Sequence, residues 1–309
     1  MKTPEPLLQS PLNYTGGKYR LLPQLLPHFP RRAGLFVDLF CGGGNVGINA
    51  AARQVLFNDA DPRLMGLLET FQRTDPADLA AFLEQTIDRY GLTRTSEYGY
   101  AHYGCESGRG VAEVNRPGFL RLRADFNAMD PAHPDYYPTL YALVLYAFNN
   151  QLRFNDAGQF NLPVGKRDFN SRMRTKLWAF QDRIRSGNYL LRCGDFRTLD
   201  PAQFGRGAFL YADPPYLITT ATYNERGGWD EAMERALLDY LDAAHAAGVR
   251  FALSNVLESK GRVNEILLEW TARNRRRYTV HHLDYHYGNA NYHTLDRTAR
   301  ADEILVVNR

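Results

Sequence analysis

Short, almost wholly apolar runs recur along the chain, and segments with the apolar spacing of an amphipathic helix lie between them. Short apolar runs predict buried strands, and strands that alternate with helices predict a mostly parallel sheet. The predicted strands are residues 34–40, 54–57, 189–193, 208–211, 250–253 and 303–307. The predicted helices are residues 46–52, 64–71, 78–90, 139–148, 231–247 and 263–272.

This alternation is interrupted between residue 61 and residue 174, where helical patterns surround a polar, glycine- and aromatic-rich stretch at 91–116. An interruption of roughly 110 residues is too long for a loop and has to fold by itself. We therefore expect an α/β core made of residues 1–61 and 174–309, and a mainly helical inserted domain made of residues 62–173.

The composition excludes several classes of protein. The chain has 309 residues, of which 44% are hydrophobic and 23% charged, so it can build a core and is not a disordered chain as a whole. Cys41, Cys105 and Cys193 are too far apart for a zinc cluster and indicate a reducing compartment. The longest apolar run, 139–148, is about half of the roughly 20 residues that cross a bilayer. We expect a cytoplasmic protein without a membrane partner.

A glycine-rich loop follows the first predicted strand, with Gly42, Gly44 and Gly47 in the spacing G-x-G-x-x-G. Such glycines allow a tight turn and let backbone N–H groups approach a ligand at a helix N-terminus. Asp59 ends the next strand, where a carboxylate can bind the ribose hydroxyls of an adenosine-containing ligand. A glycine turn beside an unrelated surface acid is the alternative. The strand context favours a nucleoside cofactor without identifying it.

A second motif, Asp213-Pro214-Pro215-Tyr216, follows the strand predicted at 208–211. This is the carboxyl edge of the sheet, where α/β proteins bind ligands. Two prolines remove two backbone donors, so the turn offers mainly acceptors, which suits a substrate amino group. Tyr216 adds an aromatic face on which a base can stack. The alternative is a rigid turn with a purely structural role.

The order of these motifs resembles that of the Dam-type, or class α, DNA adenine-N6 methyltransferases. The resemblance runs in patches over nearly the whole chain. The matching segments are Tyr14–Lys18 (YTGGK), Phe40–Gly44, Asn149–Gly165 (NNQLRFNDAGQFNLPVG), Gly194–Phe196, Asp213–Tyr216 and Leu253–Asn255. The resemblance implies a Rossmann-like methyltransferase core that uses S-adenosylmethionine, and a target-recognition insertion that binds double-stranded DNA.

The resemblance also implies which residues bind the cofactor. They are Tyr14, Lys18, Asp38, Gly42, Gly44, Asp59, Asp195, Phe196 and Asp213. Lys18 would meet the methionine carboxylate of the cofactor, Asp59 its ribose, and Asp195 and Phe196 its adenine. Core packing explains Phe196 almost as well, and a solvated turn lysine is the alternative for Lys18.

The catalytic residues implied are Asp213, Pro214 and Tyr216. The exocyclic amine of adenine is a poor nucleophile and is buried in a duplex, so the base has to be flipped into a pocket. Tyr216 would stack on the flipped base. The Asp213 carboxylate and the Pro214 carbonyl would accept the two N–H hydrogen bonds of the amine. No metal is expected.

The DNA contacts implied by the resemblance are Phe148, Asn149, Arg153, Lys166 and Arg167. Between residues 153 and 185 there are eight Lys and Arg against three Asp, which suits phosphate contact. A solvated helix face explains about half of the charges at 172–185. The polar segment 287–300 is a further candidate for a DNA-facing loop. Three residues depart from the pattern of enzymes that recognise GATC, so that specificity is not carried over: Asn13, Gln151 and Arg167.

Three other functions stay open at this point. A methyltransferase acting on N4 of cytosine would use an equivalent amine, and a non-catalytic DNA-binding protein would share the fold. An NAD-dependent dehydrogenase would explain the glycine loop but neither the second motif nor the insertion. The sequence leaves open whether a cognate restriction endonuclease acts beside the protein, and we expect a monomer.

Overall fold

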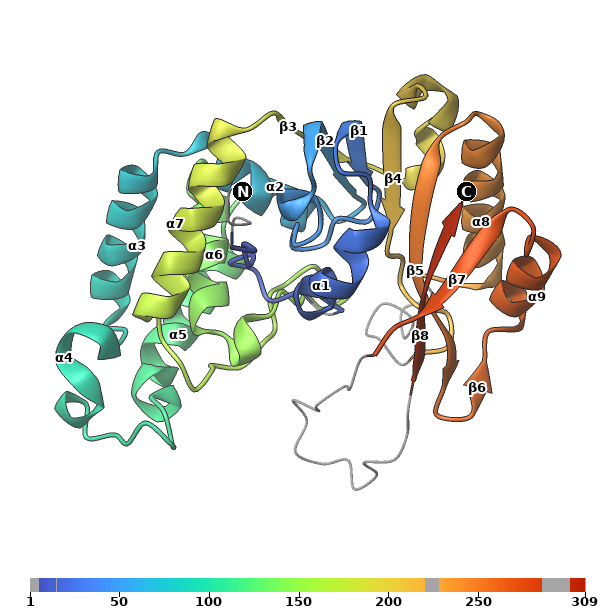
Figure 1. Cartoon of the computed structure of the whole chain (residues 1–309). Helices are drawn as coiled ribbons and strands as arrows, with labels where there is room; N and C mark the ends of the chain where they lie inside the picture. Colours follow the sequence, from blue (N-terminus) through green and yellow to red (C-terminus); the bar gives the residue numbers. More distant parts are fainter. Residues whose placement is uncertain (1–5, 15, 220–227, 285–300, 309) are drawn as a thin grey trace. The chain divides into compact units, whose positions relative to one another are not determined.

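The computed structural model describes residues 6–14, 16–219, 228–284 and 301–308, and the chain divides into two compact units (Figure 1). The first unit contains Met1–Gly17, Gly42–Ile48 and Asp61–Leu191. The second unit contains Lys18–Cys41, Asn49–Ala60 and Arg192–Arg309. The insertion predicted at 62–173 lies inside the first unit, which also includes the N-terminal residues and the glycine loop.

A sheet dominates the second unit, and its edge strand β3 begins in the last three residues of the first unit. Its order within the described residues is β3-β2-β1-β4-β5-β8-β7, with β6 paired to β5. Neighbouring strands are parallel from β2 through β1 and β4 to β5, whereas β8 is antiparallel to both β5 and β7. The mostly parallel α/β sheet predicted from the sequence is therefore confirmed. The strands are β1 (Ala33–Asp38), β2 (Ala52–Asp59), β3 (Tyr189–Cys193), β4 (Ala208–Ala212), β5 (Arg250–Ser259), β6 (Arg262–Val263), β7 (Tyr278–His282) and β8 (Asp302–Asn308).

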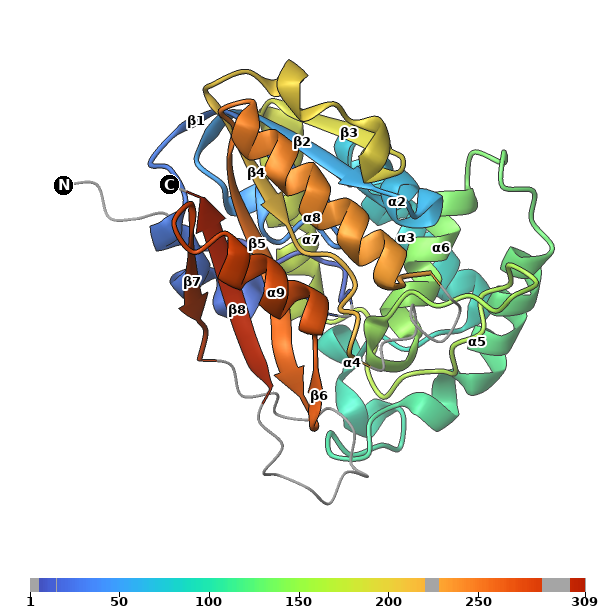
Figure 2. The same cartoon turned by 90° about the vertical axis from the view of Figure 1, so that its right-hand side faces the viewer.

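The second unit has its core between the sheet and two helices. Helices α8 (Glu231–Ala246) and α9 (Glu265–Arg273) lie across one face of the sheet (Figure 2). Leu237 and Leu241 of α8 and Trp270 of α9 pack in one apolar cluster with residues of β1, β4 and β5. The short helix α1 (Leu22–Leu25) also belongs to this unit.

The first unit is mainly helical. Its central helix, α6 (Tyr136–Tyr146), is buried almost all round, as expected for a helix without a polar face. The predicted helix at 139–148 ends earlier than expected, because the backbone of Ala147 is extended. The other helices of this unit are α2 (Pro62–Arg73), α3 (Pro76–Tyr90), α4 (Thr95–His102), α5 (Ala112–Asn127) and α7 (Ser171–Ser186).

The prediction of a helix at residues 46–52 was wrong. Only a single 3-10 turn, Gly47–Asn49, follows the glycine loop. Gly42 and Gly44 have φ angles of 48° and 77°, so the chain enters this region in a left-handed conformation that a helix cannot continue. The carbonyl of Ala51, inside the predicted helix, accepts a hydrogen bond from the backbone N–H of Ala33 in β1 and is therefore bound to the sheet. The missing helix also weakens the dehydrogenase alternative, whose glycine motif opens a helix.

Two further predictions need correction. The strand at 189–193 forms as β3, but it is not buried: it lies at the edge of the sheet, and Leu190 is 46% exposed. An edge strand has a neighbouring strand on one side only, so its side chains are enclosed less than those of a central strand. The strand β7 was not predicted, because its sequence ends in two histidines and lacks a continuous apolar run.

Candidate functional site

The second predicted motif, Asp213–Tyr216, follows β4 directly. All five residues of β4 are buried, and β4 lies between β1 and β5 with both neighbours parallel to it. Its carboxyl end is therefore fixed on both sides. Asp38, which ends β1, is in register with Tyr211 of β4.

Four side chains of the second unit meet at this strand end: Lys18, Asp213, Tyr216 and Glu303, here called the carboxylate–lysine cluster. The Lys18 Nζ atom lies 3.0 Å from Asp213 Oδ1 and 3.6 Å from a Glu303 oxygen. The Tyr216 hydroxyl is within donating distance of both carboxylates, at 3.1 Å from Asp213 and 3.2 Å from Glu303. The Lys18 ammonium also lies 4.9 Å from the centroid of the Tyr216 ring.

The cluster is charged although it is almost closed to solvent. The side chains of Lys18 and Glu303 are 4% and 1% exposed, and that of Asp213 is 17% exposed. Burial raises the pKa of Asp213 above the usual carboxyl value, and Lys18 opposes this only in part. Burial alone would lower the pKa of Lys18, but the charges of Asp213 and Glu303 raise it. Lys18 is therefore an ammonium that faces two carboxyl groups.

Glu303 was not among the predicted site residues. It is the second residue of β8, and it comes beside the motif only through the antiparallel pairing of β8 with β5, in which Glu303 faces Val256. The sequence did contain a signal. A charged residue at the start of a run predicted to be a buried strand needs a partner, because an unpaired buried charge is strongly unfavourable.

The predicted cofactor residues of the first unit lie in its glycine loop and the segment packed on it. Gly42 adopts a φ angle of 48°, and a Cβ atom there would approach the Tyr14 ring to 3.0 Å. The backbone N–H of Ser10 donates to the Asn45 side chain at 2.9 Å. The N-terminal segment 10–14 is therefore fastened to the loop, and glycine is required there both by conformation and by space.

The other predicted cofactor residues belong to the second unit. Asp38 is 1% exposed at the end of β1, and Asp59 is half-buried at the end of β2. Asp195 caps the following turn and pairs with Arg197, whose hydrogen bond lowers the pKa of Asp195. Phe196 is 3% exposed within the apolar core, with its ring centroid 5.2 Å from that of Phe40. The core-packing alternative thus describes the surroundings of Phe196.

The predicted DNA contacts Phe148 and Asn149 lie just after α6, in the segment 147–151, here called the asparagine turn. Asn149 and Asn150 have φ angles of 54° and 52°, which side chains other than glycine rarely adopt. The Asn150 side chain holds this conformation by donating to the last carbonyls of α6, at 2.7 and 3.2 Å. The side chain of Asn13 donates to the Asn149 carbonyl at 2.6 Å. Phe148 is 41% exposed on this turn.

The rest of the predicted recognition segment closes on the asparagine turn. Ala147 forms a β-bridge with Val164, and a Cβ atom on Gly165 would lie 2.4 Å from the Ala147 carbonyl. Arg153 donates to the side chain of Asn161 at 2.9 Å and is exposed. The segment 147–165 is therefore a closed loop in the first unit.

Lys166 and Arg167 follow this loop and differ in their surroundings. Both are exposed, but the Arg167 guanidinium donates to the Tyr100 hydroxyl at 2.8 Å and to the Ser107 carbonyl at 3.1 Å. In the described part of the chain, the Lys166 side chain makes no hydrogen bond or ion pair. Arg167 thus fastens the segment that contains α4.

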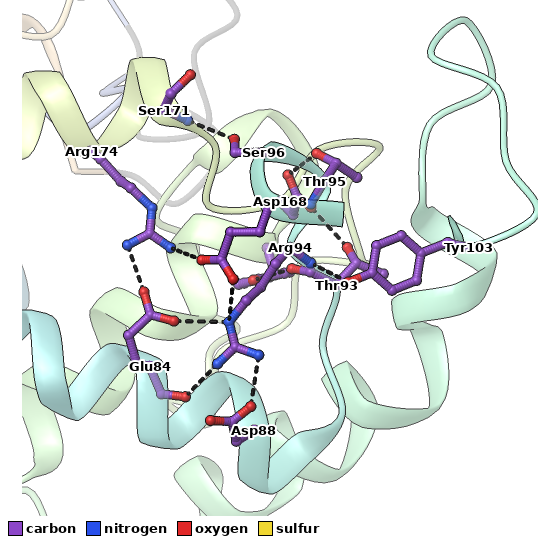
Figure 3. Close-up of polar contacts among 12 residues, drawn as sticks. Glu84, Asp88, Thr93, Arg94, Thr95, Ser96, Tyr103, Asp168, Ser171 and Arg174 are labelled. Carbon is purple, nitrogen blue, oxygen red and sulfur yellow. Dashed lines mark hydrogen bonds and ion pairs between the residues drawn. The ribbon is translucent and has the colours of Figure 1, made fainter. Parts of the chain in front are cut away.

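A buried polar network anchors the first residue of α4, Thr95, as Figure 3 shows. Asp168 is 1% exposed and accepts hydrogen bonds from the backbone and hydroxyl of Thr95, at 2.6 and 2.7 Å, and from the hydroxyl of Thr93 at 3.0 Å. These bonds satisfy the carboxylate without a cation. They hold the chain directly after Arg167 against the start of α4.

Several arginines of the predicted basic stretch are committed to internal contacts. Arg174 pairs with Glu84, which also accepts from Arg94, as Figure 3 shows. Partial burial alone would raise the pKa of Glu84, but these hydrogen bonds lower it. Arg185 lies 3.5 Å from Asp75. Ion pairs, and not the solvated helix face given as the alternative, account for these charges, so fewer basic side chains remain to contact phosphate.

In the part of the chain that the structure describes, no group of three or more His, Cys, Asp or Glu side chains could hold a metal ion. Within the same residues, each helix is too short or too polar to cross a membrane. The segment 287–300, a predicted DNA-facing loop, lies outside the described residues.

Sequence comparisons with known proteins indicate one family. The model of the D12 class N6 adenine-specific DNA methyltransferases matches residues 14–287. The type II methyltransferase M.FokI of Planomicrobium okeanokoites and the modification methylase StsI of Streptococcus sanguinis are 35% and 36% identical over 307 residues. Each match covers 97% of this chain and 43% of the relative, so the chain spans less than half the length of either. A DNA adenine methylase of Haemophilus influenzae is 25% identical over 234 residues, which are 74% of this chain and 72% of that protein.

Proposed function

Because the chain belongs to the D12 class N6 adenine-specific DNA methyltransferase family, we propose that it transfers the methyl group of S-adenosylmethionine to N6 of adenine in double-stranded DNA. The carboxylate–lysine cluster after β4 is the observation on which this proposal depends. Together with the carbonyl of the adjoining Pro214, it provides a partly exposed carboxylate and an aromatic ring at one strand end. A flipped base is bound through hydrogen bonds to its edge and stacking on its face, which these groups can supply.

The residues present suit this cofactor. The acids Asp38 and Asp59 end neighbouring strands and favour a positively charged ligand, and Asp59 would bind its ribose hydroxyls. The left-handed glycines Gly42 and Gly44 would let the backbone approach the methionine part. Asp195 and Phe196 would line the adenine. When bound, the cofactor supplies an electrophilic methyl group on a sulfonium.

Asp213 and Pro214 would activate the amine. Among the described residues, Lys18 and Tyr216 both contact Oδ1 of Asp213, so we assign Oδ2 to an N–H of the target amine. The carbonyl of Pro214 would accept the second N–H. These two bonds concentrate the lone pair on N6, which forms a bond to the methyl carbon as the carbon–sulfur bond breaks.

Tyr216 would stack on the flipped base through the ring face that Lys18 does not cover. The pairing of Lys18 with two carboxyl groups favours a role in orienting Asp213, in place of the predicted contact with the methionine carboxylate. The ammonium would fix Oδ1 and thereby the direction of Oδ2.

The DNA side of the function rests on the first unit. Phe148, exposed on the asparagine turn, would enter the duplex beside the flipped base, followed by Asn149. Arg153 would contact a base edge and Lys166 a phosphate, with a smaller contribution from the tethered Arg167. Since M.FokI is named a type II methyltransferase and StsI a modification methylase, we propose a cognate restriction endonuclease as a partner.

One experiment tests the reaction. The protein is incubated with labelled S-adenosylmethionine and unmethylated duplex DNA, and the DNA is digested to nucleosides. We expect label in N6-methyladenosine. Label in cytosine would support the N4 alternative, and DNA binding without label would support the non-catalytic alternative.

A further inference from the structure

Glu303 is a buried acid for which the mechanism above has no use. It is 1% exposed, and its strand β8 is separated from β4 by β5. Its carboxylate nevertheless reaches the motif, at 3.6 Å from Lys18 and 3.2 Å from the Tyr216 hydroxyl. Burial deprives this carboxylate of hydration, and its contacts with Lys18 and Tyr216 have to offset that loss.

Glu303 and Asp213 share the same two partners. Lys18 and Tyr216 each contact both carboxylates. The Tyr216 hydroxyl has one proton and can donate to only one carboxylate at a time. The ammonium of Lys18 is likewise divided between two acids. Neither partner is therefore fully committed to Asp213.

The charge balance of the cluster follows from this sharing. Lys18 with Asp213 alone would form a neutral pair, and Asp213 would then attract a positive substrate group weakly. Glu303 adds a second carboxylate to the single ammonium of Lys18. The cluster therefore has one more carboxylate than ammonium groups, and Lys18 neutralises Asp213 only in part. N6 becomes positive as its bond to the methyl carbon forms, and a nearby net negative charge stabilises that transition state.

We infer that Glu303 is a positioning residue for methyl transfer. It contacts Lys18 and Tyr216, so that these two groups neutralise the negative charge of Asp213 less and that charge can act on the target amine. This inference rests on the proposed function and adds a residue to it.

Two substitutions should move the titration of Asp213 in opposite directions. The groups that face Asp213 are Lys18, Glu303 from β8, Tyr216 from its own loop and Tyr211 from β4. Burial raises the pKa of Tyr211 well above its usual value, so that hydroxyl stays neutral. Glu303→Gln removes a negative charge and should lower the pKa of Asp213, whereas Lys18→Met should raise it.

The test reads this pKa in the cofactor-free protein, by carbon NMR of the chain labelled at aspartate carboxyl groups, with Asp213→Asn to assign the signal. Asp302→Asn is the matched control, because Asp302 is the preceding residue of β8 but contacts His282 instead of the cluster. We expect a lower pKa in Glu303→Gln, a higher one in Lys18→Met and no change in Asp302→Asn. An unchanged pKa in a folded Glu303→Gln variant would overturn the inference.

Transfer kinetics give the second readout. We expect Glu303→Gln to lower kcat about tenfold and to leave the KM values for DNA and for S-adenosylmethionine within about twofold. In the plot of kcat against pH, the decline on the acid side should move to lower pH. Glu303→Asp keeps the charge, so its kcat should decline with falling pH at the same pH as that of the wild type. A loss of kcat without a shift of this decline would indicate a structural role and contradict the inference.

The two proposals can fail separately, because the NMR titration needs no methyl transfer. If the wild-type protein transfers no methyl group, the proposed function fails while the titration still reports on Glu303. Should Glu303→Gln not fold, Lys18→Met is compared with Lys18→Met/Glu303→Gln, which buries one carboxylate fewer. The double variant should have the lower Asp213 pKa, and equal values would overturn the inference.

Discussion

The carboxylate–lysine cluster of the second unit is held by buried charges, whereas the asparagine turn of the first unit is held by uncharged amide hydrogen bonds. Lys18 and Glu303 are almost closed to solvent, so each depends on the others for its stability. The asparagine turn exposes Phe148 and rests on bonds to backbone carbonyls. Removing one member should therefore have a large effect in the cluster and a graded effect in the turn.

The largest effect is expected for Asp213→Ala. The substitution removes the acceptor of the target amine, and we expect kcat to fall by at least about 1,000-fold. In the wild type, transfer should decline as the pH falls through a value above the usual carboxyl range, because burial raises the pKa of Asp213 and only the carboxylate accepts the N–H. Initial rates over a pH series measure both effects.

The control for Asp213→Ala is the integrity of the remaining cluster. Lys18 still has Glu303 as a partner, so the variant should fold, with a lowered Tm, and should bind DNA with an affinity near that of the wild type. Near-normal turnover of the variant would refute the assignment of Asp213.

The next effect is expected for Phe148→Ala in the asparagine turn. Without the wedge, the flipped base loses its replacement in the stack, and we expect a roughly tenfold higher KM for DNA. The fluorescence of 2-aminopurine at the target position should also lose its increase on binding. Leu120→Ala is the matched control, since Leu120 is a similarly exposed apolar residue on α5 of the same unit. Equal behaviour of the two variants would exclude a wedge role.

A smaller effect is expected for Asn13→Ala. The variant loses one hydrogen bond to the Asn149 carbonyl, worth about 1 kcal/mol, so DNA affinity should fall about fivefold with cofactor affinity unchanged. Gln24→Ala removes comparable amide bonds to Asp284 in the second unit and should leave DNA affinity unaltered. A loss of cofactor affinity in Asn13→Ala would show that Asn13 serves the glycine loop instead.

Much of the fold could be predicted because it depends on local pattern. Apolar runs gave the strands β1, β2, β4, β5 and β8, and the family predicted from the motifs is confirmed. The predicted helix at 46–52 failed because the spacing of its apolar residues says nothing about the left-handed glycines before it. The prediction that β3 is buried was wrong, because the position of a strand within a sheet depends on tertiary structure and not on local sequence.

The candidate site divides in the same way. The motif containing Asp213 and Tyr216 is contiguous, so the sequence displays it directly. Glu303 lies far along the chain and meets Lys18 only through the register of β8 on β5, which no local pattern encodes. The left-handed conformation of Asn149 was equally hidden, because it depends on the bonds that Asn150 makes to α6.

The smallest effect distinguishes two adjacent basic residues. The side chain of Lys166 is free of hydrogen bonds and ion pairs within the described residues, whereas Arg167 donates to Tyr100 and Ser107. A phosphate contact releases about 0.9 of a counterion, so Lys166→Ala should reduce the slope of log Kobs against log salt by about 0.9. Arg167→Ala should reduce it by less than half as much, because its guanidinium is already bound to protein. The reverse order, measured by salt titration of DNA binding, would show that Arg167 leaves its tether and contacts the DNA backbone.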